Sequence, residues 1–207
     1  MSIYQYKRQF QDLLRPVSDG LVKRGFTANQ VTLSAVALSA VTAHIIAHKG
    51  ANKNVFYALP VALFARMALN AIDGMMAKEH GQQSTLGAVL NEAGDIVSDT
   101  LLIQAFAPYV DNKKGLALAN GLSTLTEIIA IIGQLQGKPR ANQGPLGKSD
   151  RAFLMGLLGV LIGSGAVKHT PFMYQSQKGL WAVNALLVAT CAKRLTFLQS
   201  EVVNAHR

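Results

Sequence analysis

The sequence has little cysteine and little charge. Its single cysteine, Cys191, excludes an internal disulfide and the usual structural zinc sites. Charged residues make up 15% of the chain, well below the ~25% typical of globular proteins. The 6 prolines and 18 glycines follow no period, which excludes collagen-like and low-complexity proteins. A soluble helical protein and a protein with several membrane-spanning helices remain.

Hydrophobic residues make up 50% of the chain and occur along its whole length, so the protein is not disordered. They form six apolar stretches of about 17–25 residues, the length that crosses ~30 Å of hydrocarbon. These stretches lie near residues 31–47, 55–77, 85–109, 116–135, 152–167 and 179–198. The pattern predicts an all-α fold, a polytopic membrane bundle of six transmembrane helices.

Residues 1–26 are expected to form an amphipathic helix on the membrane surface. Apolar residues recur there at steps of three and four, with basic residues between them, and they form no continuous apolar core. A surface helix of a soluble bundle has the same periodicity and remains an alternative. Residues 1–207 would then be a single domain, with the six-helix bundle at 27–198 and a tail at 199–207.

The chain is basic, with 20 Lys and Arg against 11 Asp and Glu, so an anionic partner is expected. If the N-terminus is cytoplasmic, thirteen basic residues fall in cytoplasmic segments and six on the opposite side. This distribution follows the positive-inside rule, and no nucleic-acid-binding module accompanies it. We therefore expect membrane lipid and no nucleic acid as the partner, with both termini in the cytoplasm.

Polar residues interrupt the second and third apolar stretches, where a lipid-facing helix would exclude them. Asn70 and Asp73 are three residues apart, and Asn91, Asp95 and Asp99 step by four, so each set shares one helix face. Clustered buried carboxylates repel one another unless they are protonated or hold a cation, and oxygen ligands suit Mg²⁺ or Mn²⁺. Hydrogen bonding between the helices through the same side chains is the alternative.

The same residues resemble the signature of the CDP-alcohol phosphotransferase family. That signature reads Asp-x2-Asp-Gly-x2-Ala-Arg-x8-Gly-x3-Asp-x3-Asp. This sequence has the same intervals over 26 positions, in the form Asn70-x2-Asp73-Gly74-x2-Ala77-Lys78-x8-Gly87-x3-Asn91-x3-Asp95. Residues 27–32 are similar to the family's entry to its first membrane helix. Members of the family transfer a substituted phosphate from a CDP-linked lipid or alcohol to an acceptor hydroxyl and release CMP.

The resemblance implies roles for individual residues. Asp95 would be the general base. Mg²⁺ or Mn²⁺ would be held by Asp73, Asn70, Asn91 and Asp95, with Asp99 as a further candidate ligand one turn beyond Asp95. The nucleotide would lie against Asn29, Thr32, Asn70, Asp73, Gly74, Ala77, Lys78 and Gly87.

The resemblance also implies the reaction partners and the location. The donor would be CDP-diacylglycerol or a related CDP-lipid, and the acceptor a small alcohol or a phosphorylated alcohol. The protein would be a homodimer in the bacterial inner membrane, with its active site at the cytoplasmic face, and would act in phospholipid biosynthesis.

A basic cluster at the start of the fifth apolar stretch is a candidate acceptor site. Lys148 and Arg151, together with the backbone N–H groups of a helix N-terminus, could hold the phosphate of a phosphorylated acceptor. A positively charged anchor at the cytoplasmic face is the alternative interpretation.

Three positions depart from the family signature. Asn70 and Asn91 stand where the family has acids, and an amide oxygen brings no charge, so the affinity for metal should fall. Lys78 replaces an arginine and loses the bidentate fork that suits phosphate. Glu92 and Glu127 are candidate replacement ligands, and Arg66 is expected to neutralise Asp73 or to pair with Glu127. These departures favour an alternative function, a catalytically impaired family member that binds a CDP-lipid or a partner.

Overall fold

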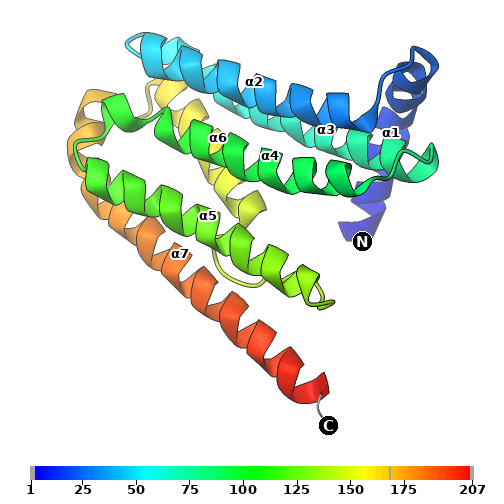
Figure 1. The fold of residues 1–207 in the computed structure, drawn as a ribbon. Coiled ribbons are helices and arrows are strands. Elements are labelled where there is room, and N and C mark those ends of the chain that lie inside the picture. Colours follow the sequence, from blue (N-terminus) through cyan, green and yellow to red (C-terminus); the bar gives the residue numbers. More distant parts are fainter. Residues whose placement is uncertain (1–2, 168, 206–207) are drawn as a thin grey trace.

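The computed structural model describes residues 3–167 and 169–205, which are almost entirely helical and contain no strand (Figure 1). The elements are α1 (Ile3–Lys23), α2 (Ala28–Lys49), η1 (Lys53–Tyr57), α3 (Ala58–Glu79), α4 (Thr85–Gln104), η2 (Ala107–Tyr109), α5 (Lys113–Leu135), α6 (Lys148–Ser164) and α7 (His169–Ala205). The all-α prediction is confirmed. Each predicted apolar stretch coincides with one of the helices α2 to α7.

In the described part of the chain, four helical segments are long and apolar enough to cross a membrane. They are Ala28–Lys49, Lys53–Glu79, Lys113–Leu135 and Lys178–Ser200. α4 carries three acids, Glu92, Asp95 and Asp99, and α6 has only 17 residues. The count of six spans therefore stays a prediction.

Two groups of helices meet at the centre of the molecule. α2 packs against α3 and α4, and α1 packs against α3. α5 and α7 run side by side, and α4 contacts α5 (Figure 1). α6 packs against α3 and η1. Side chains from α3, α6 and α7 reach the junction between α4 and α5. This junction holds the charged residues described below.

Hydrogen bonds at the helix ends hold the starts of α2 and α4 close to the end of α3. Thr27 caps α2: its side chain accepts the Gln30 N–H at 3.3 Å, and Gln30 Oε1 accepts the Thr27 N–H at 2.9 Å. Ser84 caps α4. In the link that follows α3, Gln82 Oε1 accepts the Ala28 N–H at 2.7 Å. The three helices that carry the family signature and its entry segment are thereby tied together at one end.

α1 crosses the same end of the bundle (Figure 1). Nε and Nη2 of Arg15 donate to Glu79 at 3.1 and 3.0 Å, and His80 Nε2 lies 3.0 Å from Asp19 Oδ1. A helix thus occupies most of the predicted N-terminal segment, whereas its amphipathic character and its position on a membrane surface stay predictions. At the other end of the chain, α7 continues into the predicted tail as far as Ala205, and residues 206–207 lie outside the described residues.

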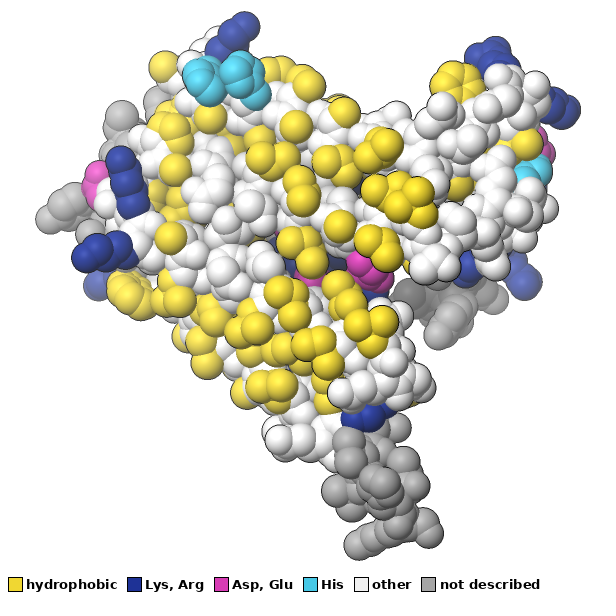
Figure 2. Space-filling model, viewed as in Figure 1, with side chains coloured by type: hydrophobic (Ala, Val, Ile, Leu, Met, Phe, Trp, Pro, Cys, Tyr) yellow, Lys and Arg dark blue, Asp and Glu magenta, His cyan; other side chains and the backbone are white. Residues whose placement is uncertain are grey.

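Large apolar side chains cover the outside of the bundle as well as its core. Figure 2 shows hydrophobic side chains spread over both groups of helices on the face in view. The exposed large apolar residues include Val41 on α2, Leu125 and Ile132 on α5, and Val188 on α7, all more than 40% exposed. Extended exposed apolar surface of this kind suits contact with a membrane.

Candidate functional site

Ion pairs join α3, α4 and α6 where the two groups of helices meet. Arg66 on α3 reaches two carboxylates of α4: its Nη2 lies 2.9 Å from Asp95 Oδ1 and its Nη1 lies 2.7 Å from Asp99 Oδ1. Lys148, the first residue of α6, pairs with Asp95 Oδ2. Arg151 Nη2, one turn further along α6, lies 3.0 Å from Asp99 Oδ2. Both oxygens of each of these carboxylates therefore face a basic side chain.

The ion pairs continue to α5, α7 and the segment between α5 and α6. Glu127 Oε1 on α5 lies 3.0 Å from Arg151 Nη2 and 3.4 Å from Arg194 Nη1. Glu127 Oε2 lies 3.2 Å from Arg140, which also pairs with Glu92 on α4. Burial lowers the pKa of the Arg140 guanidinium, but the carboxylates of Glu92 and Glu127 raise it by more, so this group stays charged.

We call this arrangement the ion-pair chain. It consists of Lys148, Asp95, Arg66, Asp99, Arg151, Glu127, Arg194, Arg140 and Glu92. Its four carboxylates face five basic side chains, so the acids that the sequence places within α4 and α5 are compensated, whereas Asp73 on α3 lies outside the ion-pair chain. Arg66 was expected to pair with Asp73 or Glu127. It pairs with Asp95 and Asp99 instead, because α4 places both carboxylates within reach of one guanidinium.

The predicted general base, Asp95, has no free carboxylate oxygen. Its Oδ1 accepts from Arg66 and also from Asn70 Nδ2 at 3.1 Å, while its Oδ2 pairs with Lys148. A carboxylate only accepts hydrogen bonds, so the amide nitrogen of Asn70, and not its oxygen, faces Asp95. Asn70 therefore binds as a hydrogen-bond donor at a position where a metal ligand would have to present an oxygen.

Most of the predicted nucleotide-binding residues lie together on α2, α3 and α4. Thr32 on α2 donates its hydroxyl to Asp73 Oδ2 on α3 at 2.7 Å. A Cβ atom added at Gly87 on α4 would lie 2.8 Å from Asn29 Oδ1 on α2, so these two helices approach closely there. A Cβ atom added at Gly74 would meet nothing within 4 Å, which leaves open space beside Asp73.

The remaining predicted nucleotide residues lie one turn further along α3. Ala77 is half-buried and packs against the apolar cluster at the start of α2, whereas Lys78 is exposed. The structure thus brings residues 29, 32, 70, 73, 74 and 87 to one end of three packed helices. Lys78 lies at the edge of this group.

A polar cavity of about 420 Å³ opens beside Asp95. It is lined by Asn91, Glu92, Asp95, Glu127, Arg140, Asn142, Gly147, Lys148, Ser149, Asp150 and Arg194. Figure 2 shows acidic and basic side chains at the bottom of a hollow between apolar surfaces. The Lys148 side chain is 34% exposed, so its ammonium group forms part of the cavity wall.

The two predicted acceptor-binding residues occupy different positions. Lys148 lines the polar cavity. Arg151 is buried behind it and donates to Thr126 Oγ1 at 3.1 Å in addition to its two carboxylates. At the start of α6, Asp150 Oδ2 accepts the Gly147 N–H at 2.9 Å, so an acidic side chain already occupies this helix N-terminus.

Arg194 is a site residue that was expected only to be one of the thirteen basic residues in cytoplasmic segments. It is 2% exposed, pairs with Glu127 and donates to the backbone carbonyl of Thr126. The signal that could have found it is its position inside the last apolar stretch, 179–198, where an arginine needs a partner. Arg140 left no such signal, because it lies outside the apolar stretches.

The predicted metal ligands do not form a metal site as they are arranged. Within residues 3–167 and 169–205, no group of three or more His, Cys, Asp or Glu side chains is placed to hold an ion. Asp95 and Asp99 are bound by basic side chains and Asn70 presents an N–H, while Asp73 accepts the Thr32 hydroxyl through Oδ2 and Asn91 lines the polar cavity. A divalent ion needs several oxygen ligands with free lone pairs, so this donor set does not fit Mg²⁺ or Mn²⁺.

The fold and the signature residues together define a family. Residues 26–191 match the sequence profile of the CDP-alcohol phosphatidyltransferase family, and the chain belongs to this family. This result confirms the resemblance seen in the sequence.

Individual relatives cover nearly the whole chain. Inner membrane protein YnbA of Escherichia coli (strain K12) is 41% identical over 91% of this chain and 91% of its own length. Phosphatidylinositol phosphate synthase of Mycobacterium tuberculosis (strain ATCC 25618 / H37Rv) is 26% identical, over 90% of this chain and 85% of its own length.

Solved structures of a phosphatidylinositol phosphate synthase from Mycobacterium tuberculosis share the fold. The structure with CDP-DAG bound has a TM-score of 0.70 and 20% identity, and the match covers 90% of this chain and 94% of that one. The structure in complex with manganese and citrate has a TM-score of 0.69 and 20% identity, with 90% and 88% covered.

Proposed function

We propose that this protein transfers a phosphatidyl group from a CDP-lipid such as CDP-diacylglycerol to a small alcohol or phosphorylated alcohol, with release of CMP. One observation carries the proposal: the signature residues of α3 and α4 meet at Asp95, beside a polar cavity lined by both acidic and basic side chains. The relatives that are phosphatidylinositol phosphate synthases, one of them solved with CDP-DAG bound, support the class of donor. The reaction belongs to phospholipid biosynthesis.

In the proposed reaction, Asp95 is the general base. When an anionic phosphate enters the cavity, the ammonium group of Lys148 turns to it and frees Asp95 Oδ2. Asp95 then takes the proton of the acceptor hydroxyl, whose oxygen bonds to the phosphatidyl phosphorus while the bond from that phosphorus to the CMP oxygen breaks. Positioning and charge compensation by the ion-pair chain supply the rest of the catalysis.

The predicted Mg²⁺ or Mn²⁺ has support only from relatives. Manganese is present in one solved synthase. The donor set of this chain does not fit a divalent ion, so the proposed reaction relies on the side chains alone.

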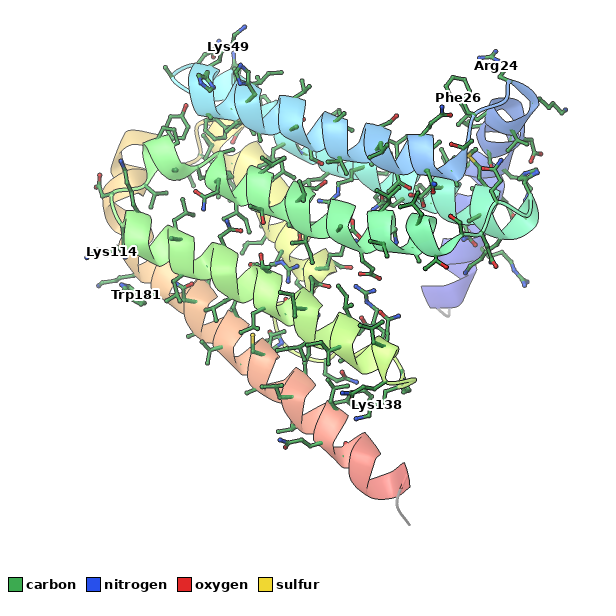
Figure 3. The ribbon with its side chains drawn as sticks, viewed as in Figure 1. Arg24, Phe26, Lys49, Lys114, Lys138 and Trp181 are labelled. Atoms are coloured by element: carbon green, nitrogen blue, oxygen red, sulfur yellow. The ribbon has the colours of Figure 1, made fainter. Side chains whose placement is uncertain are left out.

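We further propose that α2 to α7 cross the bacterial inner membrane as a homodimer, with α1 on the cytoplasmic surface and both termini in the cytoplasm. Figure 3 supports this orientation: Arg24, Phe26 and Lys138 lie at one end of the bundle, and Lys49, Lys114 and Trp181 lie at the other. The end with Arg24 and Lys138 carries the larger number of basic residues and is therefore the cytoplasmic end.

The test is CMP release from CDP-diacylglycerol by purified protein with a panel of alcohols. We expect release to depend on one acceptor, and Asp95→Asn to lower the rate by roughly 10²–10⁴-fold, the usual contribution of a general base. Asp111→Asn is the matched control, because Asp111 is exposed in the segment before α5 and should leave the rate unchanged. Equal rates for Asp95→Asn and the unmodified protein would refute the proposed role of Asp95.

A second candidate function is favoured by the engaged state of Asp95. A base whose two oxygens both face cations is held in its unreactive form, and Asn70 takes part in holding it. The protein would then bind a CDP-lipid without turnover. CDP-diacylglycerol would raise the unfolding temperature while no CMP is released with any alcohol.

A further inference from the structure

Asp95 is neutralised by basic side chains of the protein itself. Arg66 and Lys148 approach its two oxygens from different helices, α3 and α6. Arg66 also takes one oxygen of Asp99, and Arg151 takes the other. A divalent cation brought to this point would meet these three positive charges at short range, and the carboxylates that would attract it are already compensated.

Asn70 and Asn91, which stand where the family signature has acids, are consistent with this arrangement. Asn70 donates an N–H to Asp95 Oδ1, which already accepts from Arg66. An aspartate at position 70 could not donate and would repel Asp95 at the same distance. Asn91 lines the polar cavity without adding a negative charge. Both substitutions therefore suit a site whose positive charge comes from side chains.

The two basic partners of Asp95 differ in how freely they can move. The Arg66 side chain is 6% exposed and makes contacts with two carboxylates, so it is fixed. Lys148 stands at the cavity wall with a single carboxylate partner and a flexible four-carbon side chain. Arg140 and Arg194 line the same cavity. The cavity thus holds one movable and two held cations, each paired with a carboxylate that lines the same cavity, and the movable Lys148 is the cation that can turn to an incoming anion.

We infer that this site binds the phosphates of its ligand without a divalent metal, with Lys148 and Arg66 occupying the place of the ion at Asp95. The inference rests on the proposed function, because that function identifies the ligand as a CDP-lipid. Lys148 and Arg140 contact the phosphates, while Arg66 keeps Asp95 compensated when Lys148 moves to the ligand.

Two measurements on the full-length protein in detergent test the inference. The first is the Kd for CDP-diacylglycerol, measured by calorimetry in EDTA and again in Mn²⁺. The second is binding of Mn²⁺ alone, followed by loss of the free-ion signal in electron paramagnetic resonance. We expect the same Kd in both conditions and no saturable binding of Mn²⁺ by the unmodified protein.

Variants identify the groups responsible. Lys148→Met should raise the Kd for CDP-diacylglycerol by about tenfold or more, the usual effect of losing a charged hydrogen bond. Lys193→Met is the matched control, since Lys193 is exposed on α7 next to Arg194. The triple variant Asn70→Asp, Asn91→Asp, Lys148→Met restores two acids and removes one cation, so it should gain saturable Mn²⁺ binding.

The outcomes separate this inference from the proposed function. Binding of CDP-diacylglycerol that requires Mn²⁺, with stoichiometric uptake of the ion by the unmodified protein, would overturn the inference and leave the proposed function intact. No binding of CDP-diacylglycerol in either condition would refute the proposed function and the ligand assigned here. The measurements on the unmodified protein decide the matter even if a variant fails to fold.

Discussion

Arg66 has a central structural role in the ion-pair chain. It is 5% exposed, lies inside an apolar helix, and donates to two carboxylates of α4 and to the backbone carbonyl of Asp95. Buried charges are tolerated when each has a partner, and a planar guanidinium with several donors can serve two carboxylates at once. The residue therefore links α3 to α4 and sets the position of Asp95.

Replacing Arg66 with methionine should destabilise the protein strongly. The change keeps an unbranched apolar side chain but leaves one oxygen each of Asp95 and Asp99 without a cation, and breaking a buried pair in this way costs about 3–5 kcal/mol. The measurement is unfolding in detergent followed by circular dichroism. Arg24→Met, at an exposed position, serves as the control. An unchanged midpoint for Arg66→Met would mean that Lys148 and Arg151 are sufficient to hold the two carboxylates.

At the scale of the element, the helices α2 to α7 follow from sequence, whereas the partners that hold α4 in place do not. Length and apolar composition predict these six helices, since a helix is the way to satisfy backbone hydrogen bonds in an apolar setting. The convergence of α3 and α4 also follows, because side chains three or four residues apart share a face. α4 carries three acids, so its fit in the bundle depends on basic groups from α3, α6 and the segment before α6. Those partners are distant in sequence, and no local pattern identifies them.

The start of α2 offers a test at this scale. Thr27 forms a capping box with Gln30, and α2 carries Asn29 and Thr32 directly after it. Removing the cap oxygen with Thr27→Ala should lower the free energy of unfolding by ~1 kcal/mol, whereas Thr27→Ser keeps the oxygen and should be close to neutral. Chemical unfolding in detergent measures both variants. Equal losses for alanine and serine would show that the methyl group matters, and not the cap.

At the scale of the whole molecule, the sequence predicted the site better on one side than on the other. The α2–α4 side was predicted from residue spacing together with the family resemblance, and there Thr32 bonds to Asp73 while Asn70 bonds to Asp95. The opposite wall comes from α5, α7 and the segment between α5 and α6, and Arg194 was expected to be only a cytoplasmic charge. Its partner lies 67 residues away, on α5, so the pairing depends on the packing of α5 against α7.

The orientation of the bundle can be tested with cysteines, because the chain has a single one, Cys191, which is buried. In a Cys191→Ala background, Arg24→Cys and Lys138→Cys mark one end of the bundle, and Lys49→Cys and Lys114→Cys mark the other (Figure 3). A thiol reagent that does not cross the inner membrane should label the second pair in intact spheroplasts and the first pair only after lysis, since the more basic end faces the cytoplasm. The reverse pattern would place the polar cavity on the periplasmic side, away from cytoplasmic nucleotides. Labelling of one residue from each pair in intact spheroplasts would instead show that the two residues of a pair lie on opposite sides of the membrane, and it would contradict the six-helix topology proposed here.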